Sequence, residues 1–255
     1  MHILLTGASS GIGEAMARYW GGREHKLTLA ARSEDKLHQL ADELACETFV
    51  FRADLNDLSV CPELVEAAVA AFGPIDVLVN NAGIQYTEPA VGVSTERLDR
   101  LFTVDLLAPF HLVRHVLPDM LERRAGTIVN ISSMAGIIHT PGMMHYNAAK
   151  AGLAAGSESL RIELRDSGVH VLTVYPGPVA SPMEEAARKK YAATFAARLA
   201  PTGKPEVLAR LVDQAINRRK ARVVYPRLYA MTRYTRVSSQ WITDRATPPL
   251  MLEED

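Results

Sequence analysis

Short apolar runs alternate with longer amphipathic stretches along most of the chain. The runs that predict buried strands are HILLT at 2–6, KLTLA at 26–30, ETFVF at 47–51, DVLVN at 76–80, GTIVNIS at 126–132 and VHVLTVY at 169–175. Between them, apolar residues recur at helical spacing over 11–20, 34–45, 57–72, 95–123, 146–167 and 205–219. This alternation predicts a single α/β domain, a doubly wound parallel sheet with helices on both faces.

One segment interrupts the alternation. Residues 176–204, opened by PGPVASP, have the pattern of a loop with a short helix. Because loops beside a binding cleft often close over it, we expect a lid at about 180–204.

Composition narrows the class of protein. The 255 residues are 48% hydrophobic and 22% charged, which is ordinary for one globular domain, and the net charge of -1 predicts no general affinity for nucleic acid. Cys46 and Cys61 lack a metal-ligand spacing, so we interpret them as free thiols in a reducing compartment. The first apolar run is too short for a signal peptide, and no run is long enough to cross a bilayer. We therefore expect a cytoplasmic protein.

The first predicted strand runs directly into TGASSGIG, a glycine-rich turn that opens the first helix. In this position Gly7 permits a tight turn, Gly11 lets the backbone approach a pyrophosphate, and Gly13 allows the helix to pack closely on the strand. The helix N-terminus offers unpaired N–H groups and positive dipole to phosphates. A purely structural turn is the alternative, but the context favours a bound dinucleotide.

The end of the second predicted strand bears on which dinucleotide is bound. NAD-binding proteins usually carry an acidic residue there for the ribose 2′-hydroxyl, whereas this chain has Ala31 followed by Arg32. A guanidinium binds a 2′-phosphate through charge-assisted hydrogen bonds, so Arg32 favours NADP(H). The alternative is a solvated surface arginine.

The stretch HYNAAK places Tyr146 four residues before Lys150. On a helix these two side chains share a face, and a nearby cation lowers the pKa of a phenol. The pair is therefore a candidate acid/base site, although this spacing also arises by chance.

Several motifs occur together in the order of one protein family. They are TGASSGIG, NNAG at 80–83, NISS at 130–133, YNAAK at 146–150 and PGPV at 176–179. On these motifs, residues 1–225 resemble the short-chain dehydrogenase/reductases in their single-domain form with a Rossmann-type sheet. The resemblance implies an NADP(H)-dependent oxidoreductase that interconverts a ketone or aldehyde and an alcohol by hydride transfer.

The resemblance also implies roles for individual residues. Ser133 would polarise the substrate carbonyl, Tyr146 would exchange the proton, and Lys150 would lower the pKa of Tyr146 and hold the nicotinamide ribose. Ser132 would point the other way if the strand continues through it. The implied cofactor contacts are Gly7, Ser9, Ser10, Gly11, Ile12 and Gly13 in the glycine turn, Arg32, Asp54 and Leu55 at the adenosine, Asn81, Ala82 and Gly83 beside the central strand, and Tyr146, Lys150, Pro176, Gly177 and Val179 at the nicotinamide. No metal ion is implied.

One position departs from the family pattern. Asp105, in FTVDLLAPFHL, stands where the family usually has an asparagine, often counted as a fourth catalytic residue that orders a water in a proton relay from Lys150. Much of that role belongs to a backbone carbonyl at a helix kink, which aspartate also has. Alternatively, the Asp105 carboxylate pairs with Lys150 and alters its influence on Tyr146.

The sequence does not specify the substrate. We expect the cleft to be bordered by residues 133–145 and the lid. The apolar residues there, Ile137, Ile138, Met143 and Met144, form either an adaptable pocket or core and interface contacts. His139 and His145 lack partners at ligand spacing, so we interpret them as polar lining rather than metal ligands.

Residues 226–255 form a C-terminal extension beyond the 1–225 domain. In it Leu228, Met231, Tyr234, Val237 and Trp241 recur at helical spacing, with Arg227, Arg233, Arg236 and Arg245 interspersed. Such a helix packs on its own or a neighbouring subunit, or lies on a membrane surface. We favour packing, and we take the extension as a weak pointer to an apolar substrate.

Two further functions are compatible with parts of the pattern. A non-catalytic NADP-binding redox sensor or partner protein would use the same fold. An epimerase or dehydratase of the longer related type would need a larger C-terminal substrate domain. In the family the helices at 95–123 and 146–167 form the usual subunit interface, so the resemblance implies a homodimer or homotetramer.

Overall fold

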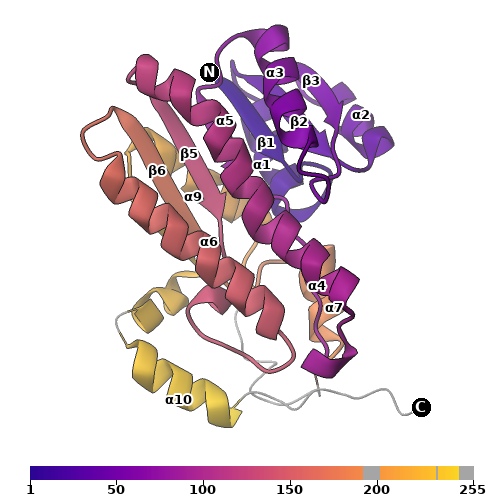
Figure 1. Ribbon diagram of the computed structural model, residues 1–255, viewed down its shortest axis with the longest axis vertical. Coiled ribbons are helices and arrows are strands. Elements are labelled where there is room, and N and C mark those ends of the chain that lie inside the picture. The colour runs from indigo at the N-terminus through magenta and orange to yellow at the C-terminus, as the bar shows by residue number, and fades with distance from the viewer. Residues whose placement is uncertain (192–201, 234, 247–255) are drawn as a thin grey trace.

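The computed structural model describes residues 1–191, 202–233 and 235–246 of the chain (Figure 1). Its centre is a seven-stranded sheet with the order β3-β2-β1-β4-β5-β6-β7, in which every pairing is parallel. The strands are β1 (His2–Thr6), β2 (Lys26–Ala31), β3 (Glu47–Arg52), β4 (Val77–Asn80), β5 (Gly126–Ile131), β6 (Val169–Pro176) and β7 (Arg222–Tyr225). The predicted α/β fold and its strands are confirmed, except that the hydrophobic pattern did not single out the short β7.

Helices cover both faces of the sheet because the buried strands alternate their side chains between two cores. Leu5 and Ile3 of β1 enter one core, where α1 (Gly11–Gly21), α2 (Glu34–Asp42) and α9 (Pro205–Asn217) pack. Leu4 enters the other core, against α3 (Val60–Phe72), α5 (Ala108–Glu122) and α6 (Met144–Glu163). Figure 1 shows α5 and α6 lying across the same face. The order of the strands reverses between β1 and β4, and ligands of open α/β sheets bind at the carboxyl ends of the strands beside such a switch point.

The predicted helix at 95–123 is interrupted. The segment consists of α4 (Thr95–Phe102), a π-helical turn η2 (Thr103–Leu107) and α5. The N–H of Ala108 bonds to the carbonyl of Thr103, five residues back, which marks one extra residue in the turn. Asp105 lies in this turn and is fully buried. After the turn, the ring of Phe110 in α5 packs against Gly156 of α6. A Cβ on Gly156 would lie 2.5 Å from that ring, so the two helices meet closely at this point.

The outer strand β7 is tied to α6 by a charged cluster around Glu158. Arg222 at the start of β7 makes two hydrogen bonds to the Glu158 carboxylate, Arg161 makes one at 3.1 Å, and the Tyr175 hydroxyl donates one at 3.2 Å. Burial by itself would raise the pKa of Glu158, but the bonds from Arg222 and Arg161 lower it below its usual value. The cluster therefore stabilises the edge of the sheet when Glu158 is ionised.

The predicted lid contains a short helix, α7 (Pro182–Arg188), whose first turn is capped by the Ser181 hydroxyl. A parallel bridge between Val179 and Gly203 joins its two ends. The part of the lid at 192–201 lies outside the described residues.

In the described residues of the C-terminal extension there are two short helices, η4 (Arg227–Arg233) and α10 (Arg236–Ala246), at the carboxyl-end side of the sheet in Figure 1. Gln240 of α10 bonds to both the N–H and the carbonyl of His139, at 2.8 and 3.0 Å. The extension thus packs on its own subunit. Leu228, Val237 and Trp241 are exposed there. Tyr234, the side chains of Arg233 and Arg236, and residues 247–255 lie outside the described part.

No helix in the described ranges is long and apolar enough to span a membrane.

Candidate active site

The glycine turn joins β1 to α1 at the carboxyl end of the sheet. Gly7 and Gly11 have φ values of 67° and 57°, a left-handed conformation that other residues rarely adopt. A Cβ on Gly7 would lie 2.7 Å from the Cα of Ala82, and a Cβ on Gly13 would lie 2.1 Å from the carbonyl oxygen of Gly7. The positions of Gly7 and Gly13 therefore have no room for side chains, so the backbone there forms the surface that a ligand would meet.

The first turn of α1 is suited to an anion. Ser10 is the N-cap residue, yet its side chain makes no capping hydrogen bond. The N–H groups of the first turn therefore keep the positive end of the helix dipole directed at the glycine turn. Ile12 packs against the core, and Ser181 of the lid lies over the turn, since a Cβ on Gly11 would be 3.1 Å from the Ser181 Cβ. This arrangement fits a pyrophosphate.

Thr6 holds the NNAG loop against the glycine turn, a role that the sequence reasoning missed. Its buried hydroxyl accepts hydrogen bonds from the N–H groups of Asn81 and Ala82, at 3.0 and 3.1 Å. The Asn81 side chain in turn donates to the carbonyls of Thr6 and Gly7, at 3.0 and 3.2 Å. A polar residue at the end of an otherwise apolar strand was the available signal.

One pocket, the adenosine pocket, is lined by some of the residues predicted to contact the cofactor in the glycine turn, at the adenosine and beside the central strand. They are Gly7, Ser9, Arg32, Asp54, Leu55, Ala82 and Gly83. Arg32 is exposed at the end of β2, and the Asp54 carboxylate lies 3.5 Å from the Arg100 guanidinium of α4. Leu55 is buried beneath the pocket. The structure thus brings together residues from four separate loops.

The two serines after β5 point in different directions. The Ser132 hydroxyl is buried and donates to the carbonyl of Lys150 at 2.7 Å. The Ser133 hydroxyl lies on the side of Pro176, 3.4 Å from its carbonyl, and accepts from the N–H of Ala135. The Ser133 hydroxyl also lowers the pKa of Tyr146, as expected if the two side chains lie near one another.

Tyr146 and Lys150 lie on one face of α6, and both are buried. The Lys150 Nζ is 5.8 Å from the centre of the Tyr146 ring, 3.3 Å from the carbonyl of Ile131 and 3.2 Å from the Asp105 Oδ2. Lys150 therefore forms a buried ion pair with Asp105 within reach of the tyrosine. The predicted catalytic residues are thus brought together, while their roles stay predictions.

The electrostatics of this group differ from the expectation of a lowered tyrosine pKa. Burial raises the pKa of Tyr146 above its usual value, and although Lys150 lowers it, Asp105 raises it again. Burial would lower the pKa of Lys150, but Asp105 and Tyr146 raise it overall. Burial likewise raises the pKa of Asp105 against the opposing effect of Lys150. Because residue 105 has a carboxylate rather than an amide, it raises the pKa of both Tyr146 and Lys150.

The loop after β6 is the predicted nicotinamide wall. The N–H of Gly177 donates to the carbonyl of Tyr225 at 2.7 Å, and a Cβ on Gly177 would lie 3.0 Å from the ring of Tyr229. Val179 is buried, and the Pro176 carbonyl faces Ser133. Tyr229 comes from η4, so the C-terminal extension supplies part of this wall, which the sequence reasoning missed.

The apolar residues of the 133–145 segment divide between two places. Ile137 and Ile138 pack with Tyr175 and Tyr229, whereas Met143 packs in the cluster that contains Tyr146. Met144 is exposed. Of these four residues, only Met143 therefore packs in the cluster of the tyrosine.

The two histidines of this segment are placed differently. His139 is held by Gln240 and by the carbonyl of Ala135, whereas His145 is buried. Within the described ranges, no group of three or more histidine, cysteine, aspartate or glutamate side chains is arranged to hold a metal ion.

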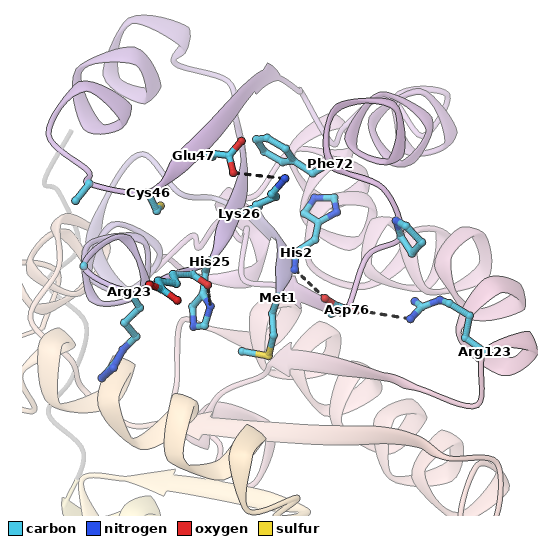
Figure 2. A pocket seen from close by; sticks show the side chains of 14 residues that line it. Met1, His2, Arg23, His25, Lys26, Cys46, Glu47, Phe72, Asp76 and Arg123 are labelled. Carbon is cyan, nitrogen blue, oxygen red and sulfur yellow. Dashed lines mark hydrogen bonds and ion pairs between the residues drawn. The ribbon is translucent and has the colours of Figure 1, made fainter.

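A second pocket lies at the opposite edge of the sheet, where the strands begin (Figure 2). Its charged side chains are largely paired with one another: Lys26 with Glu47 at 3.4 Å, and Arg123 with Asp76 at 3.6 Å. It contains none of the predicted site residues. We therefore place the candidate site at the carboxyl ends of the strands.

Known proteins with similar sequences and structures indicate what kind of protein has this arrangement of residues. A family model described as short chain dehydrogenase matches residues 1–192. A 3-oxoacyl-[acyl-carrier-protein] reductase of Thermotoga maritima is 34% identical over 214 residues, which cover 82% of this chain and 87% of that protein. The structure of a short-chain dehydrogenase from Sphingobium yanoikuyae in complex with NADPH superposes with a TM-score of 0.79 at 27% identity, covering 99% of this chain and 98% of that one. The closed form of a serine dehydrogenase complexed with NADP+ gives 0.76 at 29% identity, over 85% and 89% of the two chains.

Proposed function

This chain belongs to the short-chain dehydrogenase family, and on that premise we propose that it is an NADP(H)-dependent oxidoreductase that interconverts a ketone or aldehyde and an alcohol. The observation that carries the proposal is the convergence of Ser133, Tyr146 and Lys150 beside the glycine turn. Ser133 follows β5, whereas Tyr146 and Lys150 lie on α6, and both Ser133 and Lys150 act on the pKa of Tyr146.

The cofactor assignment rests on the adenosine pocket. Arg32 lines that pocket with its side chain exposed to the place where a ribose 2′-phosphate would lie, and no acidic residue occupies the position before it. Two of the similar structures hold NADP+ or NADPH. Both observations favour NADP(H) over NAD(H).

In the proposed reaction, a nicotinamide cofactor held by these residues would supply or accept a hydride. Ser133 and Tyr146 donate hydrogen bonds to the carbonyl oxygen and stabilise the negative charge that develops on it. Tyr146 then gives its phenolic proton to that oxygen, and the resulting phenolate is reprotonated from solvent. In the oxidative direction the same groups act in reverse, with the phenolate as base. Lys150 holds the ribose and stabilises the phenolate.

For the substrate we propose an apolar carbonyl compound. Met143 beside Tyr146, and the Ile137 and Tyr229 cluster next to the nicotinamide loop, give the adjoining walls an apolar character. One relative is named as a 3-oxoacyl-[acyl-carrier-protein] reductase, and the acyl chain in that name is apolar. Residues 1–225 would form the catalytic domain, with 226–255 as an extension that completes its wall.

We also propose that the protein is a homo-oligomer. Leu107, Phe110, Leu121 and Ile162 are exposed apolar side chains on η2, α5 and α6. These elements belong to the two helical segments, 95–123 and 146–167, that are expected to form the subunit interface. Contact of α10 with a membrane surface remains the alternative for the exposed Val237 and Trp241.

The test is consumption of NADPH absorbance with a panel of ketones and aldehydes that differ in chain length. Wild type should turn over at least one of them, and Tyr146→Phe should lower kcat by about 10²-fold or more while binding NADPH normally, because the phenol acts in proton transfer. Activity of Tyr146→Phe within about tenfold of wild type would contradict the assignment. NADPH binding without turnover of any carbonyl would instead support the non-catalytic alternative.

A further inference from the structure

The carboxylate of Asp105 has two partners, one on each oxygen. Oδ1 accepts a hydrogen bond of 2.7 Å from the N–H of Ile84, and Oδ2 lies 3.2 Å from the Nζ of Lys150. The side chain of Asp105 is completely buried, and that of Lys150 is 4% exposed. This is therefore an ion pair in the interior of the site, where charges interact more strongly than in water.

The surroundings are shaped to contain the pair. A Cβ on Gly83 would lie 3.2 Å from both the Asp105 Oδ2 and the Lys150 Nζ, so a larger residue there would crowd the two charged groups. The π turn η2 places Asp105 between the NNAG loop and α6. The pair is thus built by three separate segments rather than by a chance contact at the surface.

An asparagine in this place would not make the same contacts. Its single carbonyl oxygen would accept from Ile84, and its amide would then turn donor hydrogens toward the ammonium of Lys150. With aspartate, both contacts are favourable and the charge of Lys150 is balanced. The choice of residue therefore changes the charge of the site while leaving its shape nearly the same.

This balance acts on Tyr146, which shares the face of α6 with Lys150. With Lys150 positive and Asp105 negative, the group of three is neutral when Tyr146 is a phenol and carries a net negative charge when it is a phenolate. A net charge in a buried site is costly, so the phenol is favoured. Within the described ranges, the polar groups recorded beside these three side chains are the Ser133 hydroxyl, the Ile131 carbonyl and the Ile84 N–H, which are all uncharged. The phenol of Tyr86 packs in the same cluster as Tyr146.

We propose that Asp105 is a positioning residue that neutralises Lys150, keeps Tyr146 in its proton-bearing form, and so adapts the site to carbonyl reduction at neutral and alkaline pH. The inference rests on the proposed function for the identity of the reaction. Asp105 does not change the equilibrium of that reaction. It changes the pH range in which each direction runs, because reduction needs the phenol and oxidation needs the phenolate.

The experiment is a pH titration of the free protein by tyrosinate absorbance, in which the signal of Tyr146 is isolated by subtracting the titration of Tyr146→Phe. Asp105→Asn keeps the size of the side chain and the bond to Ile84, and should move the ionisation of Tyr146 down by about one pH unit or more, a tenfold change in equilibrium. The titration of Tyr146→Phe is subtracted from that of wild type, and the titration of Asp105→Asn/Tyr146→Phe is subtracted from that of Asp105→Asn. No substrate is needed, so the result is independent of whether a carbonyl compound is turned over.

Asp213→Asn is the matched control. Asp213 is also a buried aspartate, but it lies on α9 and accepts a hydrogen bond from the Trp20 indole at 3.0 Å. Its replacement should leave the titration of Tyr146 unchanged. If Tyr146 ionises in Asp105→Asn at the same pH as in wild type or at a higher pH, the inference is overturned. This includes the case in which Lys150, once it lacks Asp105, loses its own proton and no longer favours the phenolate.

A second measurement uses folded wild type alone. Tyr146 should ionise at a higher pH than an ordinary exposed tyrosine, whose pKa is about 10. Ionisation below that value would overturn the inference even if Asp105→Asn failed to fold. Where a carbonyl compound is reduced, the alkaline loss of kcat should move to lower pH in Asp105→Asn, a change that a purely structural role of Asp105 would not produce.

Discussion

Replacing Arg32 with alanine should weaken NADPH binding and leave NADH binding nearly unchanged. The structure records no hydrogen bond or ion pair of Arg32 with any residue in the described ranges, and its side chain is exposed at the rim of the adenosine pocket. The substitution therefore removes little that stabilises the fold. Its effect on binding should come from the one group that distinguishes the cofactors, the 2′-phosphate.

The magnitude follows from the kind of contact. A hydrogen bond to a charged group contributes about 1.5–3 kcal/mol, and each 1.4 kcal/mol is a factor of about ten in Kd. We therefore expect Arg32→Ala to raise the Kd of NADPH by about 10- to 100-fold, with values towards the lower end at high salt because the site is exposed. Adding Ala31→Asp places an acid where it accepts the ribose 2′-hydroxyl and repels the phosphate, so the double variant should prefer NADH.

The assay is titration of both cofactors against wild type and variants at fixed ionic strength. Arg52→Ala is the control, because Arg52 ends the neighbouring strand opposite Ala31 but is not part of the pocket lining. It should change both Kd values little and by similar factors. A wild type that prefers NADH, or an equal loss of both cofactors in Arg32→Ala, would refute the contact with the phosphate.

Other substitutions test the remaining parts of the structure. Ser133→Ala should lower kcat by about 10²-fold, and Ser132→Ala should lower it less, because only Ser133 faces the substrate oxygen; the opposite order would contradict the orientation of the two side chains. Gln240→Ala should raise KM for apolar carbonyl compounds and speed amide exchange in 133–145, whereas unchanged exchange would mean that α10 does not hold this segment. Glu158→Gln should lower the free energy of unfolding by about 1 kcal/mol at neutral pH, and the difference from wild type should vanish as acid protonates Glu158. Burial lowers the pKa of His170, so wild type should lose stability as pH falls below about 6.5; the Tm of His170→Asn should fall less over the same range.

The features that the sequence predicted well are those set by local chemistry. Gly7 and Gly11 could be assigned because only glycine readily adopts their backbone conformation, and the buried strands because their apolar runs have few other uses. Ser132 and Ser133 were distinguished by the alternation of side chains along an extended backbone. In each case a short stretch of sequence carries the physical constraint.

The features that were missed depend on contacts between distant segments. The π turn at 103–107 follows the same apolar pattern as a regular helix, so periodicity does not reveal it. Tyr229 and Gln240 reach the site only because the extension folds back over the carboxyl ends of the strands. Lys150 lowers the pKa of Tyr146 as predicted, but the net direction could not be predicted for a related reason. It depends on burial and on Asp105, which is far away along the chain.

The extra residue in η2 also sets a limit on how this segment can evolve or be engineered. A π turn holds one residue more than an α-helical turn, so removing one residue from 103–107 would let 95–122 form one continuous α-helix in which α4 and α5 keep their faces. Phe110 would then keep its place over Gly156, whereas Asp105 would lose the turn that directs it at Lys150. The length of this turn is therefore constrained by the site more than by the fold. Libraries that sample single-residue deletions across 103–107 should recover folded clones in which the pairing of Asp105 with Lys150 is lost.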